Sequence, residues 1–196
     1  MRLRNPCTGD LVREIRASDL PVWSMCEVPV GDGFLLATGS GDGKVRLWNS
    51  CTGDLVYAMK IDFARSSPTG ANQVNSLCAV SLGGRTVLAI GGSNVEIWNP
   101  ESGNRLHILN SRADRDIKFL CEIEINGHHM LAGSDYDGTC AELWDPADRY
   151  QGNPLEVQRG IELIGAIRTG SRTFLACKTF DTIALQDLQA IFKRTF

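Results

Sequence analysis

The sequence predicts an all-β protein built from repeated four-stranded antiparallel sheets. The stretch "RLRNPCTGDLV" at residues 2–12 returns almost unchanged as "RLWNSCTGDLV" at residues 46–56. Related segments begin at Val22, Val74, Ile117 and Ile161. A spacing of roughly 40 to 50 residues is typical of propellers and solenoids. Within each segment, apolar and polar residues alternate over short runs separated by Gly and Asp, which is the pattern of strands joined by hairpins.

The first complete segment contains four expected strands. They lie at 22–28, 34–40, 44–49 and 55–60, from the inner edge of the sheet to the outer edge. Asp42-Gly43 is expected to form a two-residue hairpin turn, because both central positions of such a turn require positive φ. Gly9, Gly53 and Gly103 recur after the third strand, where a left-handed backbone favours glycine.

Ahead of the first complete segment, the sequence matches only half of a sheet. Residues 2–5 correspond to a third strand and residues 11–15 to an outer strand. We expect one domain over residues 1–196, with a half sheet at 1–16 and complete sheets at 17–62, 72–110, 117–158 and 161–196. An open arc is favoured, its missing sheets belonging to another chain or to a lost or separately encoded segment. A closed ring of four or five sheets, in which the C-terminus completes the half sheet, is the alternative. Some other β arrangement is the third reading.

Two repeat positions are expected to build the core. Cys26, Cys78 and Cys121 share one position on the inner strand, where Gly165 stands in the last segment. Trp48, Trp98 and Trp144 share a position on the third strand, where Gln186 stands in the last segment. The cysteines are interpreted as small residues that fit a crowded axis, and the tryptophans as buried packing residues.

Three stretches carry a resemblance to a known family. "LLATGSGDGKVRLWNSCTG", "VLAIGGSNVEIWNPESG" and "MLAGSDYDGTCAELWDP" resemble the Trp-Asp (WD) repeats of β-propellers. Each four-stranded sheet then corresponds to a propeller blade. The inner strand also looks like that of bacterial signalling proteins that carry a propeller, which points to a partial propeller of bacterial type.

The match to the WD pattern is incomplete. Only Trp144-Asp145 keeps the dipeptide, and the Gly-His element before the inner strand is absent, with Ala17-Ser18 in its first place. The family often links this His to the Trp through a buried Asp, for which Asp42, Asp137 and Asp181 are the candidates here. Without the His, we expect plainer blades in which these aspartates cap hairpin turns.

Composition and motifs indicate no catalytic, metal-binding or nucleic-acid-binding site. A net charge of -3 provides no basic field for nucleic acid, and no apolar run of about 18 residues is long enough to span a membrane. No cofactor, metal or catalytic residue is expected, so the chain is predicted not to be an enzyme. "GSGDGK" at residues 39–44 and "DYDG" at residues 135–138 lack the residues that a phosphate loop and a calcium loop require. A cytoplasmic location is expected.

These observations favour a protein-interaction scaffold or sensor module of the WD-repeat type. The alternative is a degenerate or truncated propeller fragment without independent activity. Partners are expected to be proteins, with self-association or a complementing propeller chain as further expectations. The candidate partner-binding residues come from loops: Phe63, Arg65, Arg112, Asp114, Arg115 and Tyr136.

Overall fold

The computed structural model describes residues 1–61, 73–111, 116–125, 127–135, 141–147, 155–158, 162–169, 172–178 and 183–188. These residues form five antiparallel sheets in chain order. The sheets consist of β1 (Arg2–Arg4) and β2 (Leu11–Glu14); β3 (Val22–Val30), β4 (Gly33–Ser40), β5 (Lys44–Asn49) and β6 (Leu55–Lys60); β7 (Ser76–Leu82), β8 (Arg85–Gly91), β9 (Val95–Asn99) and β10 (Asn104–Leu109); β11 (Ile117–Ile125), β12 (His128–Asp135), β13 (Ala141–Trp144) and β14 (Leu155–Gln158); and β15 (Glu162–Thr169), β16 (Arg172–Lys178) and β17 (Ile183–Asp187).

The predicted fold class is confirmed. Three sheets have four antiparallel strands, and β1 and β2 pair with each other as a half sheet. The last sheet has three described strands, because the residues expected to form its outer strand lie outside the described part of the chain. In the first complete sheet the strands start and end within two residues of their expected limits.

The turn between β4 and β5 differs from the prediction. It spans three residues, Gly41 to Gly43, instead of the two-residue turn expected at Asp42-Gly43. The amide of Gly43 donates to the carbonyl of Ser40 (3.2 Å), and Gly43 has a φ of 72°. A three-residue loop that ends in a glycine with positive φ joins these strands, so the two-residue prediction was wrong.

Strand pairing shows that the repeats are equivalent. The inner-strand residues Cys26, Cys78, Cys121 and Gly165 pair with Ala37, Ala89, Ala132 and Ala176, respectively. The third-strand residues Trp48, Trp98, Trp144 and Gln186 pair with Leu36, Leu88, Leu131 and Leu175, respectively. The last sheet therefore keeps the register of the others even though it lacks the Trp and the Cys.

The core lies between neighbouring sheets. The innermost strands contact one another in chain order, β3 against β7, β7 against β11 and β11 against β15. Each interface buries an apolar cluster. The residues Leu47, Ile97 and Leu143, at one position of successive third strands, are each at most 2% exposed, because the next sheet covers them. A fourth cluster, around Ile15, Ala17 and Trp48, joins the half sheet to the first complete sheet.

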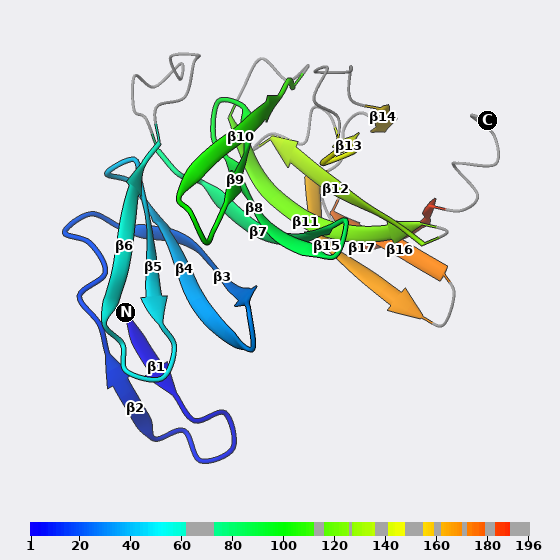
Figure 1. Cartoon of the computed structure of the whole chain (residues 1–196). Coiled ribbons are helices and arrows are strands. Elements are labelled where there is room, and N and C mark those ends of the chain that lie inside the picture. Colours follow the sequence, from blue (N-terminus) through cyan, green and yellow to red (C-terminus); the bar gives the residue numbers. More distant parts are fainter. Residues whose placement is uncertain are drawn as a thin grey trace.

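The sheets form an open series. Figure 1 shows β1 and β2 at one end of the series and β15 to β17 far from them. Among the described strands, none joins the half sheet to the last sheet. Met25 and Leu185 occupy positions that are buried in the interior interfaces, but they are 51% and 57% exposed. Both end faces therefore carry apolar residues of the kind that neighbouring sheets cover elsewhere in the fold.

Candidate interaction surfaces

Serine side chains connect the inner strands across the sheet interfaces. Ser24 Oγ accepts a hydrogen bond from the Leu77 amide (2.9 Å), and Ser76 Oγ accepts one from the Leu120 amide (2.9 Å). In the next sheet Phe119 replaces this serine, and its strand partner Ser134 accepts from the Leu163 amide (3.1 Å). The inner strands β7, β11 and β15 are thus each held by the sheet before them.

A second repeated contact joins the outer strands to the following sheet. Arg13, Tyr57 and His107 share one repeat position, and each contacts backbone carbonyls in the turn after the next third strand. Arg13 donates to the carbonyls of Cys51 and Thr52, Tyr57 Oη donates to that of Pro100, and His107 Nε2 lies 2.9 Å from that of Pro146. The Arg13 side chain lies so close to Gly53 that a Cβ at this glycine would clash with Arg13 Cδ. These contacts fix the angle between neighbouring sheets.

The first complete sheet contains a charged network around Asp42. Arg46 Nη2 forms an ion pair with Asp42 Oδ2 (2.6 Å), and the hydroxyls of Ser40 and Ser18 donate to the same carboxylate. Partial burial by itself raises the pKa of Asp42, but the hydrogen bonds and the charge of Arg46 outweigh it and lower the pKa to about 2.

Asp42 caps its turn as expected, because it accepts from the Lys44 amide (3.1 Å). The expectation of a plain blade is nevertheless wrong for this sheet. Arg46 supplies the positive partner, and Ser18 stands where the family's histidine would lie.

The three tryptophans have different hydrogen-bond partners. Their Nε1 atoms donate to Thr38 Oγ1 (2.9 Å) from Trp48, to Glu96 Oε2 (2.9 Å) from Trp98, and to the Asn110 carbonyl (2.8 Å) from Trp144. Trp48 and Trp144 are buried, whereas Trp98 is only partly buried. In the three complete sheets this position is thus a packing site, and the polar partner of the tryptophan varies from sheet to sheet.

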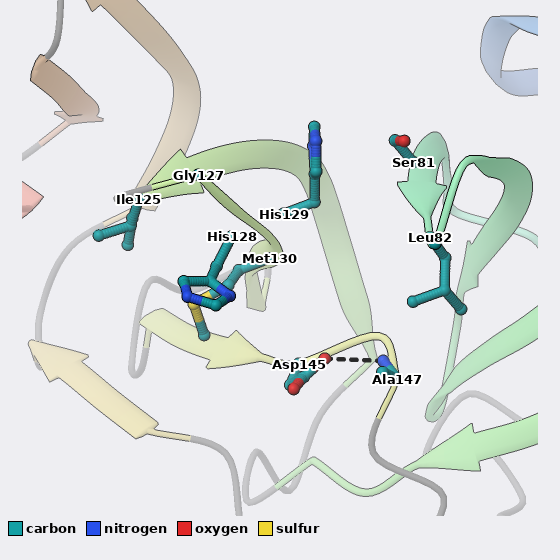
Figure 2. A pocket seen from close by; sticks show the side chains of 10 residues that line it. Ser81, Leu82, Ile125, Gly127, His128, His129, Met130, Asp145 and Ala147 are labelled. Carbon is teal, nitrogen blue, oxygen red and sulfur yellow. Dashed lines mark hydrogen bonds between the residues drawn. The ribbon is translucent and has the colours of Figure 1, made fainter.

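A pocket of about 420 Å³ lies between the second and third complete sheets, at the end where their inner hairpins turn. It is lined by Ser81, Leu82, Gly83, Ile125, Gly127, His128, His129, Met130, Asp145 and Ala147. Figure 2 shows Leu82 facing Asp145 and Ala147, with His128 and Met130 on the adjoining hairpin. The walls are apolar at Leu82, Ile125 and Met130, and the polar groups stand at the rim.

Within this pocket, the polar side chains are held in place by neighbours. His129 Nδ1 lies 2.9 Å from Glu122 Oε1, and that same carboxylate oxygen accepts from the Ser81 amide (2.8 Å). Asp145 accepts from the Ala147 amide (2.8 Å) and so caps the turn on one side of the pocket. The pocket is therefore a preformed recess suited to a protruding side chain of another protein.

The described residues include potential metal ligands and thiols. Among them, no group of three or more His, Cys, Asp or Glu side chains could hold a metal ion. Burial raises the pKa of the Cys26 and Cys121 thiols to about 12 and also raises that of Cys78, which keeps all three protonated near neutral pH. These thiols are packing residues of the inner strands.

None of the six predicted partner-binding residues belongs to the described part of the chain. Phe63, Arg65, Arg112, Asp114, Arg115 and Tyr136, together with Asp137, lie outside the described residues. The pocket was not predicted from the sequence. Its walls come from two repeats some forty residues apart, and no local motif marks that pairing. The described residues include no helix with the length and hydrophobicity needed to cross a membrane.

Comparison with known proteins agrees with this geometry. The family model described as "WD domain, G-beta repeat" matches residues 9–49, which run from the first turn glycine to the end of β5. The chain contains a WD repeat. The side chain after each third strand accepts a hydrogen bond from the amide two residues later. This acceptor is Asp145 in one sheet and Asn5, Asn49 and Asn99 in the others, so Asn caps the turn where the family has Asp.

Two relatives from Caenorhabditis elegans share parts of this WD-repeat chain. The Ribosome biogenesis protein BOP1 homolog is 34% identical over 83 residues, which cover 41% of this chain and 11% of the relative. The Periodic tryptophan protein 2 homolog is 26% identical over 162 residues, which cover 64% of this chain and 17% of the relative. The chain thus spans less than a fifth of either relative. The expected bacterial type of propeller is not tested by these matches and stays a prediction.

Proposed function

We propose that this WD-repeat chain is a non-catalytic scaffold module that binds a protein partner through the pocket between its second and third complete sheets. The pocket supports this proposal because its walls belong to two sheets whose relative angle is fixed by the Ser76 and His107 contacts. A recess on a rigid frame is already ordered, so a partner binds it without the entropy loss of ordering the site.

The partner chemistry follows from the lining. Leu82 and Met130 offer partly buried apolar contact, while His128 and Asp145 are exposed at the rim. An apolar side chain flanked by polar backbone fits this distribution, as in the central pockets of protein interfaces. The name of one relative makes ribosome assembly the first process in which to seek such a partner. A cytoplasmic location remains part of the proposal.

The proposal also includes association through the two uncovered end faces. Met25 and Phe34 are about half exposed at one end, and Ile183 and Leu185 are 70% and 57% exposed at the other. Exposed apolar patches of this kind mark interaction surfaces. A second copy of the chain or a complementing propeller chain would cover them.

Affinity capture with matched variants tests the pocket. Leu82→Asp and Met130→Asp place a charge on its walls, whereas Val56→Asp places one on an outer strand of another sheet, where Val56 is 50% exposed. We expect a partner that is retained by the wild type and by Val56→Asp and is lost with both pocket variants. If the wild type and all three variants retained the partner equally, with unchanged melting temperatures, the partner would bind outside the pocket.

A further inference from the structure

Asp145 is the one acidic side chain among the described residues that line the pocket between the second and third complete sheets. Its Oδ1 atom accepts the Ala147 amide (2.8 Å), and its Oδ2 atom has no hydrogen-bond or ion-pair partner in the described part of the chain. Asp145 is exposed to solvent, and Figure 2 shows its carboxylate across from Leu82. One carboxylate oxygen is therefore available to a ligand at the edge of the pocket.

The turn next to the pocket does not require the charge of Asp145. At the equivalent positions of the half sheet and the first two complete sheets, the Oδ1 atoms of Asn5, Asn49 and Asn99 accept the corresponding amide hydrogen at 2.8 to 2.9 Å. Because a neutral amide oxygen caps these turns at the same distance, the negative charge of Asp145 adds nothing that the turn needs. That charge is free to act in recognition.

No basic side chain in the lining neutralises Asp145. Among the described lining residues none is Lys or Arg, and Arg85, the strand partner of Leu82, lies outside them. In the adjoining recess, Arg168 donates to both carboxylate oxygens of Glu124. The edge of the pocket thus carries an uncompensated negative charge, which attracts a cationic group at short range.

His129 adds a hydrogen-bond acceptor to the lining. Its Nδ1 atom lies 2.9 Å from Glu122 Oε1, which also accepts the Ser81 amide. Since a carboxylate only accepts, Nδ1 carries the proton, and Nε2 of the neutral imidazole is an acceptor. Acceptors beside the apolar walls at Leu82 and Met130 match a side chain that has several donors on an apolar stem.

We propose that the pocket recognises a basic side chain, Arg or Lys, that stands next to the apolar side chain of a partner protein. The apolar side chain contacts Leu82 and Met130, and the guanidinium or ammonium group donates to Asp145 Oδ2. Arg and Lys carry several donors on a long apolar stem, and that stem lies along the apolar walls. This inference rests on the proposed function of the pocket and specifies the chemistry of its partner.

Two matched peptides test the proposal on the full 196-residue chain. Acetyl-Leu-Gly-Arg-amide places Leu and Arg on one side of an extended backbone, and acetyl-Leu-Gly-citrulline-amide replaces the guanidinium by a neutral urea of similar shape. With methyl-labelled methionine, NMR follows Met130 in the pocket and Met59, which is buried in another interface, as the control.

Only the Met130 signal should shift saturably, and the citrulline peptide should bind about three- to tenfold more weakly than the arginine peptide at low salt. Added salt should reduce this difference, because it screens an exposed charge pair. Equal binding of the two peptides, or no shift of the Met130 signal, would overturn the proposal.

A matched pair of variants identifies the group that binds the cation. Asp145→Asn keeps a cap for the turn and removes the charge, whereas Asp54→Asn removes one charge from an exposed position between β5 and β6. The preference for arginine over citrulline should vanish in Asp145→Asn and persist in Asp54→Asn, with melting temperatures equal to that of the wild type. A preference that persisted in Asp145→Asn would contradict the assignment.

Affinity capture separates this inference from the proposed function. We expect Leu82→Asp to lose the partner and Asp145→Asn to retain less of it than the wild type. A partner lost with Leu82→Asp but retained equally by Asp145→Asn and the wild type would show that the pocket binds through apolar contact alone. That result would overturn the inference and leave the proposed function intact, whereas full retention by both variants would overturn both.

Discussion

Trp144 and Trp98 occupy equivalent positions but should differ in their contribution to stability. Trp144 is 3% exposed within the cluster between the second and third complete sheets, whereas Trp98 is only partly buried. We expect Trp144→Ala to cost about 3 to 5 kcal/mol of unfolding free energy and Trp98→Ala about 1 to 3 kcal/mol. Urea denaturation measures both. A larger loss for Trp98→Ala would contradict this order of burial.

Asp42 should make stability depend on acid pH. Its pKa in the folded chain is about 2, below the ordinary value of 3.8, so folding favours the ionised carboxylate. The sign follows directly: its contribution is present above about pH 4 and is lost as the pH falls towards 2. The stability difference between wild type and Asp42→Asn should therefore shrink between pH 4 and pH 2. A difference that stayed constant over this range would show that the carboxylate charge is not used.

The interfaces between strands of neighbouring sheets depend on a few polar contacts at repeated positions. Ser76 illustrates this, because its hydroxyl accepts the amide of Leu120 where both residues are nearly buried. Without it, the amide would lose its acceptor in a place that water reaches poorly. The apolar cluster alone cannot set the rotation of one strand against the next, since hydrophobic contact has no preferred direction.

Ser76→Ala should lower the unfolding free energy by about 1 to 3 kcal/mol, the usual cost of a buried group left without its partner. Ser102→Ala, in an exposed turn of the same sheet, is the matched control and should change it by less than about 0.5 kcal/mol. Chemical denaturation gives both values. Similar stabilities for the two variants would mean that water replaces the serine at the interface.

The open series of sheets gives the N-terminal half sheet a role in stability. In the structure, Met1, Leu3 and Ile15 of the half sheet belong to the apolar cluster around Trp48. Deletion of residues 1–16 should lower the melting temperature and make Trp48 fluorescence accessible to acrylamide. Tyr57→Phe, which removes one contact between later sheets, is the control and should leave Trp48 shielded. Unchanged quenching after the deletion would show that the half sheet does not cover Trp48.

Self-association should proceed through the end faces. Leu185 stands at the position of Leu47, Ile97 and Leu143 but is 57% exposed, so a charge there opposes burial of this face without disturbing an interior interface. Leu185→Asp should reduce the mass measured by light scattering at high concentration. Val56→Asp, on a solvent-facing outer strand, should not. Equal masses for both variants and the wild type would assign association to another surface.

The sequence by itself determined the strands and the repeat. Alternating hydrophobicity and turn residues are local signals. Because successive side chains of a strand point to opposite faces, the alternation shows where a strand runs and which residues share a face. The limits of β3 to β6 were therefore predicted closely. Internal repetition then fixed which residues are equivalent, and the pairing of Cys26, Cys78 and Cys121 with alanines agrees with it.

Only the tertiary structure decided what each repeated position does. Three different side chains, Arg13, Tyr57 and His107, each contact a backbone carbonyl of the next sheet. Their residue types differ and the carbonyl is not visible in the sequence, so this common role could not be predicted. The Asp42 network and the pocket depend on side chains that sheet packing brings together. A local sequence pattern does not specify distances between residues that are far apart in the chain. Met25 and Leu77 occupy the same repeat position, but Met25 is exposed and Leu77 is buried. The difference arises because a neighbouring sheet covers only Leu77, and burial of an apolar side chain depends on such a neighbour.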